Sequence, residues 1–191
     1  MHTTQQKFEE TAIIIKQEEI ADDIYSMWLH TEQIAAHAKA GQFVSVYCKE
    51  GSRLLPRPIS ICEIDKEGGK LRVVYRVTGE KTGTEEFSQM KAGDTIPVIG
   101  PLGNGFPFEK AEGKKVFLMG GGIGVPPILE LAKQMECEKK QIVVGYRDAH
   151  TFLKEEFEQA GELYISTEDG SVGTKGNVMD AIRENALEAD M

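Results

Sequence analysis

The hydrophobic and polar positions of this chain follow two patterns, one on each side of a Gly- and Pro-containing stretch at Gly103–Gly113. Before it, short runs rich in Ile, Val, Tyr and Phe alternate with turn residues, which is typical of antiparallel strands. The pattern predicts strands at Thr11–Lys16, Ile24–His30, Gln42–Tyr47, Ile59–Ile64, Lys70–Val77 and Thr95–Ile99. Six short strands at such spacing indicate a small antiparallel Greek-key β-barrel.

One short helix is predicted within this first half, at Thr84–Met90. Thr82 and Glu85 have the spacing of a capping box, in which a hydroxyl and a carboxylate each accept a backbone N–H at the helix start. Thr84 is the alternative N-cap.

The second half alternates strands and helices. Strands are predicted at Val116–Met119, Ile142–Gly145 and Leu163–Ser166, and helices after Pro126-Pro127, at Thr151–Gln159 and at Asn177–Leu187. Strand–helix alternation predicts a parallel sheet with right-handed crossovers. We therefore expect a two-domain protein, with a barrel at residues 8–108 and a Rossmann-like α/β nucleotide-binding domain at residues 113–191. Three strands are few for a doubly wound domain, so we expect this second domain to be incomplete, with its C-terminal part missing.

Composition narrows the class of partner. Lys and Arg number 22 against 31 Asp and Glu, a net charge of −9, which argues against non-specific binding to nucleic acid or to acidic membranes. The N-terminal residues are polar and resemble no signal peptide, and no apolar run is long enough to span a bilayer. We expect a cytoplasmic protein.

The cysteines give no sign of a metal site. Cys48, Cys62 and Cys137 are odd in number, widely spaced and without a C-x-x-C pair. This pattern argues against a disulfide framework, a zinc site or an iron–sulfur site in this chain.

A first candidate for chemistry is Arg57-Pro58-Ile59-Ser60, between two apolar runs. Arg offers a planar cationic fork for phosphate, Pro keeps the chain extended, and Ser adds a hydroxyl that both donates and accepts. These groups suit a ligand with a phosphate end and a flat polar ring, such as a flavin nucleotide. An ordinary turn on the surface of a β-protein is the alternative.

Other segments add to this hypothesis. Gly120–Gly124 lies between a predicted strand and a predicted helix, where glycines allow close backbone approach and the helix start attracts phosphate; a plain strand–helix turn is the alternative. Gly83-Thr84 opens the short helix and offers amides to an anion, or merely caps it. Tyr75, followed by the cation Arg76, has a ring that could stack on a flat ligand, or is an ordinary strand residue.

Together these segments resemble the ferredoxin–NADP reductase superfamily, and within it the electron-transfer subunits of class B dihydroorotate dehydrogenases. The resemblance is carried by Leu55–Ile61, Val74–Val77, Gly100–Phe106, Gly120–Pro127 and Thr167–Gly173, and covers nearly all of residues 10–190.

The resemblance implies FAD in the barrel, NADH as hydride donor at the α/β domain, and a dihydroorotate dehydrogenase catalytic subunit as partner in pyrimidine synthesis. Ser60 would act near the flavin N5 as the catalytic residue. The implied cofactor-binding residues are Arg57, Pro58, Ile59, Ser60, Val74, Tyr75, Arg76, Gly83 and Thr84 for FAD, and Gly121, Gly122 and Gly124 for NADH.

The chain also departs from the family. Relatives continue with a Cys-Gly-Pro segment and a cysteine-rich loop that holds a [2Fe–2S] cluster, and none of the three cysteines here matches those ligands. The segment Gly79–Thr84 is two residues longer than the family's usual Gly-Glu-Gly-Thr, so Gly79 and Gly83 both remain candidates for FAD.

The sequence leaves two further choices open. Arg147 suits a 2′-phosphate and Asp148 a 2′-hydroxyl, so NADH and NADPH are not separated by the residues. The alternative functions are a subunit of an NADH-dependent ferredoxin:NADP oxidoreductase, and a module that binds a nucleotide without electron transfer.

Overall fold

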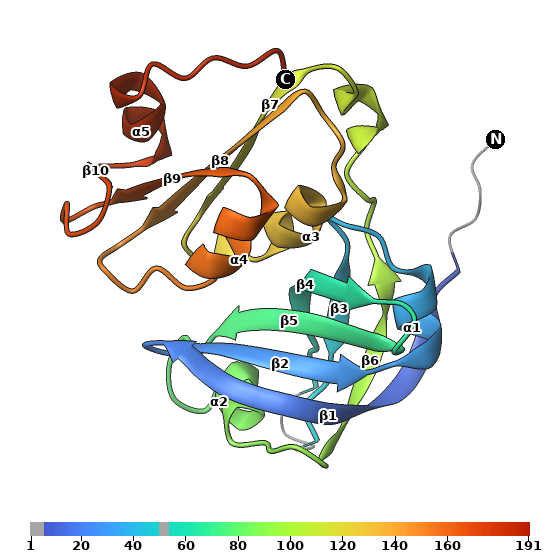
Figure 1. Cartoon of the computed structure of the whole chain (residues 1–191). Coiled ribbons are helices and arrows are strands. Elements are labelled where there is room, and N and C mark those ends of the chain that lie inside the picture. The colour runs from blue at the N-terminus through green and yellow to red at the C-terminus, as the bar shows by residue number, and fades with distance from the viewer. Residues whose placement is uncertain (1–5, 50–53) are drawn as a thin grey trace. The chain divides into compact units, whose positions relative to one another are not determined.

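The computed structural model describes residues 6–49 and 54–191, and the chain divides after Phe106 into two compact units (Figure 1). The first contains β1 (Phe8–Ala21), β2 (Ile24–His30), α1 (Glu32–His37), β3 (Phe43–Val46), β4 (Arg57–Asp65), β5 (Lys70–Arg76), α2 (Gly83–Ser88) and β6 (Thr95–Leu102). The second contains η1 (Phe108–Ala111), β7 (Lys115–Gly121), η2 (Gly122–Gly124), α3 (Pro127–Gln134), β8 (Lys139–Tyr146), α4 (Lys154–Ala160), β9 (Glu162–Thr167), β10 (Thr174–Lys175) and α5 (Val178–Glu184).

The first unit is the predicted six-stranded barrel. Its strands close in the order β1-β2-β5-β4-β3-β6, and every pair is antiparallel. β1 shows why the alternation predicted it: Ala12 and Ile14 are buried, whereas Ile13 and Ile15 are 44% exposed on the outer wall. Side chains of one strand point alternately to its two faces, so one set fills the barrel and the other faces outward.

The barrel interior is filled by apolar side chains from every strand and from both helices. Ile14, Leu29, Leu71 and Ile96 come from strands, and Phe87 enters from α2 with none of its surface exposed. Burying an aromatic side chain of this size contributes about 1.5–3 kcal/mol. This contact holds the short α2 against the barrel.

Helix α1 was not predicted, since the sequence analysis expected only one helix among these strands. It has six residues, of which only Ile34 and Ala35 are buried, too few to show a helical period. A residue distant in sequence supports it: the Glu10 carboxylate accepts from the backbone N–H groups of Ile34 at 2.8 Å and Gln33 at 3.3 Å.

The second unit is a parallel sheet in the order β10-β9-β8-β7. The predicted parallel arrangement is confirmed, but the predicted number of strands was wrong, because β10 adds a fourth strand of two residues. Figure 1 shows α3 and α4 on one face of this sheet and α5 on the other. Among the described helices of both units, none is long and apolar enough to cross a bilayer.

The edge of β7 that does not face β8 carries the last residues of the chain. The Asp190 N–H donates to the Lys115 carbonyl oxygen at 2.8 Å, and the Phe117 N–H donates to the Met191 carbonyl oxygen at 2.8 Å. Backbone groups on both edges of β7 are thus used at its start.

Candidate functional site

The barrel brings Arg57 and Gly83 into contact although they are far apart in sequence. Arg57 is the first residue of β4, and Gly83 the first residue of α2. A Cβ atom at Gly83 would stand 2.8 Å from the Arg57 Nε and 2.7 Å from the Cys48 Sγ. Such distances are shorter than a van der Waals contact, so only glycine lets the guanidinium lie over the start of this helix.

This contact bears on the choice between Gly79 and Gly83. Gly83 is buried against Arg57, whereas a Cβ at Gly79 would meet nothing within 4 Å. Of these two glycines, Gly83 is therefore the one that lies against the Arg57 side chain.

The start of α2 is fixed by a hydroxyl cap. The Thr82 Oγ1 accepts from the Glu85 N–H at 3.2 Å, so the N-cap is Thr82 and not Thr84. The Glu85 carboxylate accepts from the Lys81 N–H and not from the Thr82 N–H, so the predicted reciprocal capping box is not formed. The Thr84 hydroxyl lies 3.2 Å from that of Thr82, which places it at the same end of the helix.

The strand alternation of β4 separates its candidate residues. Ile59 points into the barrel core and is 7% exposed, whereas Pro58 is exposed and Ser60 half-buried. Pro58 and Ser60 therefore offer side chains outside the core. Arg57 pairs with Val46 and shares a face with Ile59, but it stands at the start of the strand, where its guanidinium lies at Gly83. Ile59 offers mainly its backbone.

Tyr75 lies on β5 beside Val74 and Arg76, the other two candidates of that strand. Its ring points inward and is 3% exposed, stacked on Tyr25 at 5.8 Å between ring centroids and edge-on to Phe87 at 6.0 Å. Burial raises the pKa of its hydroxyl, which donates to the Gln17 Oε1 at 3.0 Å. The suggested stacking of this ring on a ligand therefore does not fit, because core side chains already cover it. Val74 is also buried, and Arg76 is exposed at the strand end.

The glycine loop of the second unit has two kinds of glycine. At Gly120 a Cβ would stand 2.8 Å from the Gly124 carbonyl oxygen, so the tight turn itself requires glycine there. At Gly122, which has φ +53°, and at Gly124 a Cβ would meet nothing within 4 Å, and at Gly121 only the Gly145 oxygen at 4.0 Å. The loop therefore leaves open space over the backbone of the three predicted glycines.

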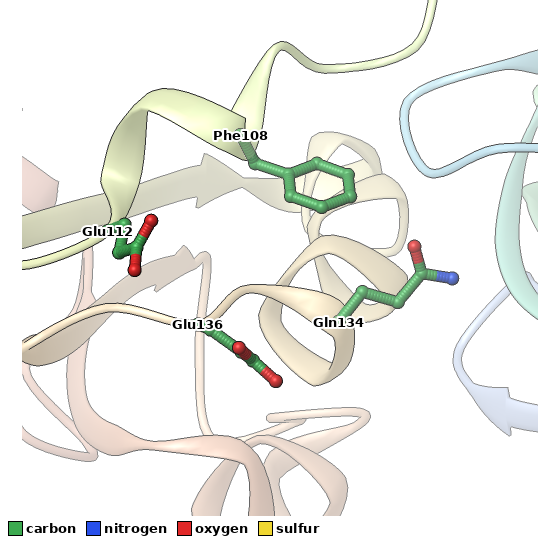
Figure 2. A pocket seen from close by; sticks show the side chains of 4 residues that line it. All are labelled: Phe108, Glu112, Gln134 and Glu136. Atoms are coloured by element: carbon green, nitrogen blue, oxygen red, sulfur yellow. The ribbon is translucent and has the colours of Figure 1, made fainter.

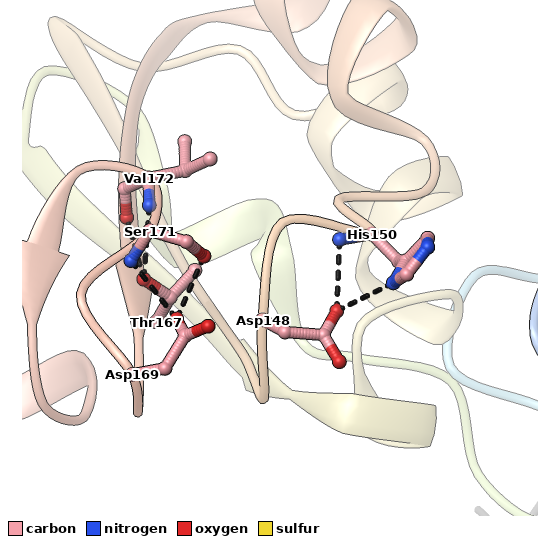
Figure 3. A network of polar contacts seen from close by, with 6 residues as sticks. All are labelled: Asp148, His150, Thr167, Asp169, Ser171 and Val172. Atoms are coloured by element: carbon pink, nitrogen blue, oxygen red, sulfur yellow. Dashed lines mark hydrogen bonds and ion pairs between the residues drawn. The ribbon is translucent and has the colours of Figure 1, made fainter.

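Two polar turns follow the neighbouring strands β8 and β9 at the same edge of the sheet as this loop, because parallel strands end together. In the first, Asp148 accepts from the His150 backbone N–H at 2.9 Å and lies 2.7 Å from the His150 Nδ1 (Figure 3). These hydrogen bonds lower the pKa of the Asp148 carboxyl.

In the second turn, Asp169 accepts from the Ser171 hydroxyl at 2.7 Å and backbone N–H at 2.9 Å, which lowers the pKa of its carboxyl (Figure 3). The Thr167 hydroxyl fixes this turn by donating to the Val172 carbonyl oxygen at 2.9 Å. Thr167–Gly173 resembles a family motif in sequence, but that resemblance predicted no role for its residues. Their position directly after a predicted strand and their turn-forming residue types were the signal that could have placed these residues at this edge of the sheet.

A hollow of about 310 Å³ lies in the second unit, lined by Phe108, Glu112, Gln134 and Glu136 (Figure 2). Glu112 precedes β7 and Glu136 precedes β8, so it lies at the amino ends of these strands. Ligands of open α/β sheets bind outside the carboxyl ends. This hollow is thus separate from the glycine-loop edge.

Comparison with known proteins identifies the first unit. The family model described as an oxidoreductase FAD-binding domain matches residues 11–106. Relatives named dihydroorotate dehydrogenase B (NAD(+)), electron transfer subunit, are 41% identical over 190 residues in Geobacillus sp. (strain WCH70) and 41% identical over 187 residues in Bacillus caldolyticus. The chain belongs to this electron-transfer-subunit family. These alignments cover 96% and 95% of the chain and 72% of each relative.

Solved structures agree with this fold. The NADH-dependent reduced ferredoxin-NADP oxidoreductase structure is similar at a TM-score of 0.82 and 32% identity, covering 98% of this chain and 66% of that one. A ferredoxin NADP+ reductase from Neisseria gonorrhoeae is similar at a TM-score of 0.75 and 18% identity, covering 94% of this chain and 76% of that one. The latter supports the fold alone. Both are similar over nearly the whole chain, which supports a fold with a barrel followed by an α/β unit.

Proposed function

We propose that this chain is a flavoprotein electron-transfer subunit that takes hydride from NADH onto FAD and passes electrons to a dihydroorotate dehydrogenase catalytic subunit. The observation that carries the proposal is the contact of Arg57 with Gly83 inside an oxidoreductase FAD-binding domain. A cation and a helix start whose first residue has no side chain are groups that suit a diphosphate.

FAD fits the residues present at this barrel end. Arg57 would neutralise the diphosphate, and Gly83 and Thr84 would offer backbone N–H groups and a hydroxyl to it. Pro58, Ile59 and Ser60, with the backbone of Val74 to Arg76, would hold the ring, and the Ser60 hydroxyl would donate to its N5 edge. When bound, FAD supplies hydride acceptance from a nicotinamide and onward transfer of single electrons.

NADH fits the glycine loop. Gly121, Gly122 and Gly124 leave room for the pyrophosphate to approach the backbone. Asp148 and Asp169 stand at the same edge, near enough to each other for the Asp169 charge to act on the Asp148 carboxyl. Two carboxylates would repel a 2′-phosphate and accept from a 2′-hydroxyl, so we propose NADH as the donor.

The relatives support a dihydroorotate dehydrogenase catalytic subunit as the partner. Those proteins are named as electron transfer subunits of a dihydroorotate dehydrogenase, and this chain spans 70–72% of their length. A second candidate is a subunit of an NADH-dependent ferredoxin-NADP oxidoreductase, favoured by the 32% identity to that structure. Affinity purification from the native host separates the two: co-purification of dihydroorotate dehydrogenase supports the first, and of ferredoxin-oxidoreductase chains with no dihydroorotate dehydrogenase the second.

The FAD site is tested by titrating the flavin-free chain with FAD and following flavin fluorescence. We expect saturable binding, weakened in Arg57→Ala by about 1.5–3 kcal/mol, the value of a charged hydrogen bond. Arg183→Ala is the charge-matched control, since Arg183 lies exposed on α5 beside Asp180. A chain that binds no FAD, or an Arg57→Ala variant that binds as tightly as the control, would contradict the proposed site.

A further inference from the structure

Gln17 of β1 is bonded to two of the three barrel segments proposed to bind FAD, β5 and α2. Its side-chain amide is half-buried between β5 and α2. The Nε2 donates to the Met90 carbonyl oxygen at 2.8 Å and the Phe87 carbonyl oxygen at 2.9 Å, and lies 3.3 Å from that of Ser88. The Oε1 accepts from the Tyr75 hydroxyl at 3.0 Å.

These bonds satisfy carbonyl groups at the end of a short helix that is otherwise held by the burial of Phe87. The last carbonyl groups of a helix have no partner within the helix, and the last turn of α2 contains no basic residue. With only six residues, α2 cannot persist on its own propensity. Gln17 therefore supplies donors that α2 needs where the helix ends.

The Tyr75 hydroxyl decides which way the amide faces. A hydroxyl that donates to Oε1 leaves Nε2 directed at α2, where only carbonyl oxygens are offered. Tyr75 itself is fixed by its edge-on contact with Phe87 at 6.0 Å. β5 and α2 are thus joined by hydrogen bonds through Gln17 and by the direct contact of Tyr75 with Phe87.

We infer that Gln17 is a positioning residue for the flavin site, an inference that rests on the proposed function. It acts through α2: the helix is held at its C-terminal end by Gln17, and its N-terminal end presents Gly83 under Arg57. There is no room for even a Cβ between Gly83 and the Arg57 Nε, so a shift of this helix changes how its start lies against the cation. Gln17 touches no ligand and is assigned no part in the chemistry.

The test replaces the amide by an apolar side chain of similar size, in Gln17→Met, and compares it with Gln42→Met. Gln42 is a matched control in the same barrel, since its buried side-chain amide also bonds two backbone groups. It accepts from the Lys39 N–H at 2.8 Å and donates to the Gly103 carbonyl oxygen at 2.9 Å. FAD affinity and urea stability are measured for both, and hydrogen exchange is measured at residues 83–90.

We expect Gln17→Met to raise the FAD dissociation constant about tenfold, the equivalent of one lost hydrogen bond, and to speed exchange in α2. Gln42→Met should lose comparable stability, bind FAD within about twofold of the unsubstituted chain and leave α2 exchange unchanged. Tyr75→Phe, which keeps the ring, should have a smaller effect in the direction of Gln17→Met.

Equal FAD affinity in folded Gln17→Met and the unsubstituted chain would overturn the positioning role alone, as would equal loss of affinity in the two Met variants. Absence of FAD binding by the unsubstituted chain would instead overturn the proposed function, and this inference with it.

Discussion

The Arg57 side chain lies against the backbone of Gly83, with the guanidinium Nε 2.8 Å from the place that a Cβ would take. A Gly83→Ala variant must displace the guanidinium, the Cys48 thiol or the helix start. We expect FAD affinity to fall at least about tenfold, because Arg57 loses its place beside the helix. Flavin fluorescence titration measures this.

Gly79→Ala is the control for that variant. It meets no atom within 4 Å, although its φ of +136° strains any other residue. We expect Gly79→Ala to lose stability while keeping its FAD affinity. If Gly79→Ala weakens FAD binding and Gly83→Ala does not, Gly79 and not Gly83 is the glycine of the flavin site.

The glycine loop offers a paired experiment on the second unit. Gly120→Ala places a methyl group 2.8 Å from the Gly124 carbonyl oxygen and 3.1 Å from the Val125 Cα, and should lower the unfolding free energy by about 1–3 kcal/mol. Gly124→Ala meets nothing within 4 Å, so it should fold normally but hinder an approaching pyrophosphate and raise the NADH dissociation constant about tenfold. Thermal unfolding and NADH titration together check both. Loss of stability without loss of NADH affinity in Gly124→Ala would remove this glycine from the nucleotide site.

The carboxylates at the ends of β8 and β9 predict a preference between nicotinamide cofactors. In a chain carrying both Asp148→Asn and Asp169→Asn, two negative charges are removed from the edge where a 2′-phosphate would lie. We expect NADPH affinity to rise about tenfold relative to NADH, as loss of like-charge repulsion predicts. Titration calorimetry with each nucleotide measures it, and Glu158→Gln on α4 is the control. An unchanged ratio of NADPH to NADH affinity would mean that the ribose does not bind at this edge of the sheet.

The turn between β4 and β5 should respond to acid. The Asp65 carboxylate accepts from the Gly68 N–H at 2.8 Å and lies 3.4 Å from the Lys70 Nζ, which lowers the pKa of Asp65. A carboxyl whose pKa is lower folded than unfolded stabilises the fold above its unfolded pKa, and this stabilisation is lost as pH falls through its folded pKa. As pH drops below the ordinary pKa of Asp, the Gly68 amide should therefore lose protection, measured as its exchange rate relative to that of an unstructured amide at the same pH. In Asp65→Asn this pH dependence should disappear; its persistence would assign the response to another group.

The sequence could not predict how the candidate residues point. Tyr75 was a candidate stacking ring because aromatic residues near phosphate-binding motifs suit flat ligands, but the parity of β5 turns it into the core. Its partners, Gln17 and Phe87, come from β1 and α2, and nothing in the local sequence of Val74–Arg76 reveals them. Helix α1 escaped prediction for a similar reason, since its N-terminal amides are satisfied by Glu10 of β1.

By itself the sequence determined the barrel and the parallel sheet, because alternation, turn residues and glycine loops are local properties that the chain carries wherever it folds. The order of its motifs carried the resemblance to the family. Only the tertiary structure decided that Gly83 is the glycine beside Arg57, that the Tyr75 ring is covered, and that Gln17 ties α2 to β5. These depend on strand register and on side-chain direction in the closed barrel, where residues as distant in sequence as Ile14 and Asp94 share a hydrogen bond. The periodicity of a sequence indicates which face of a strand or helix a residue lies on, whereas tertiary packing decides which residues it contacts there.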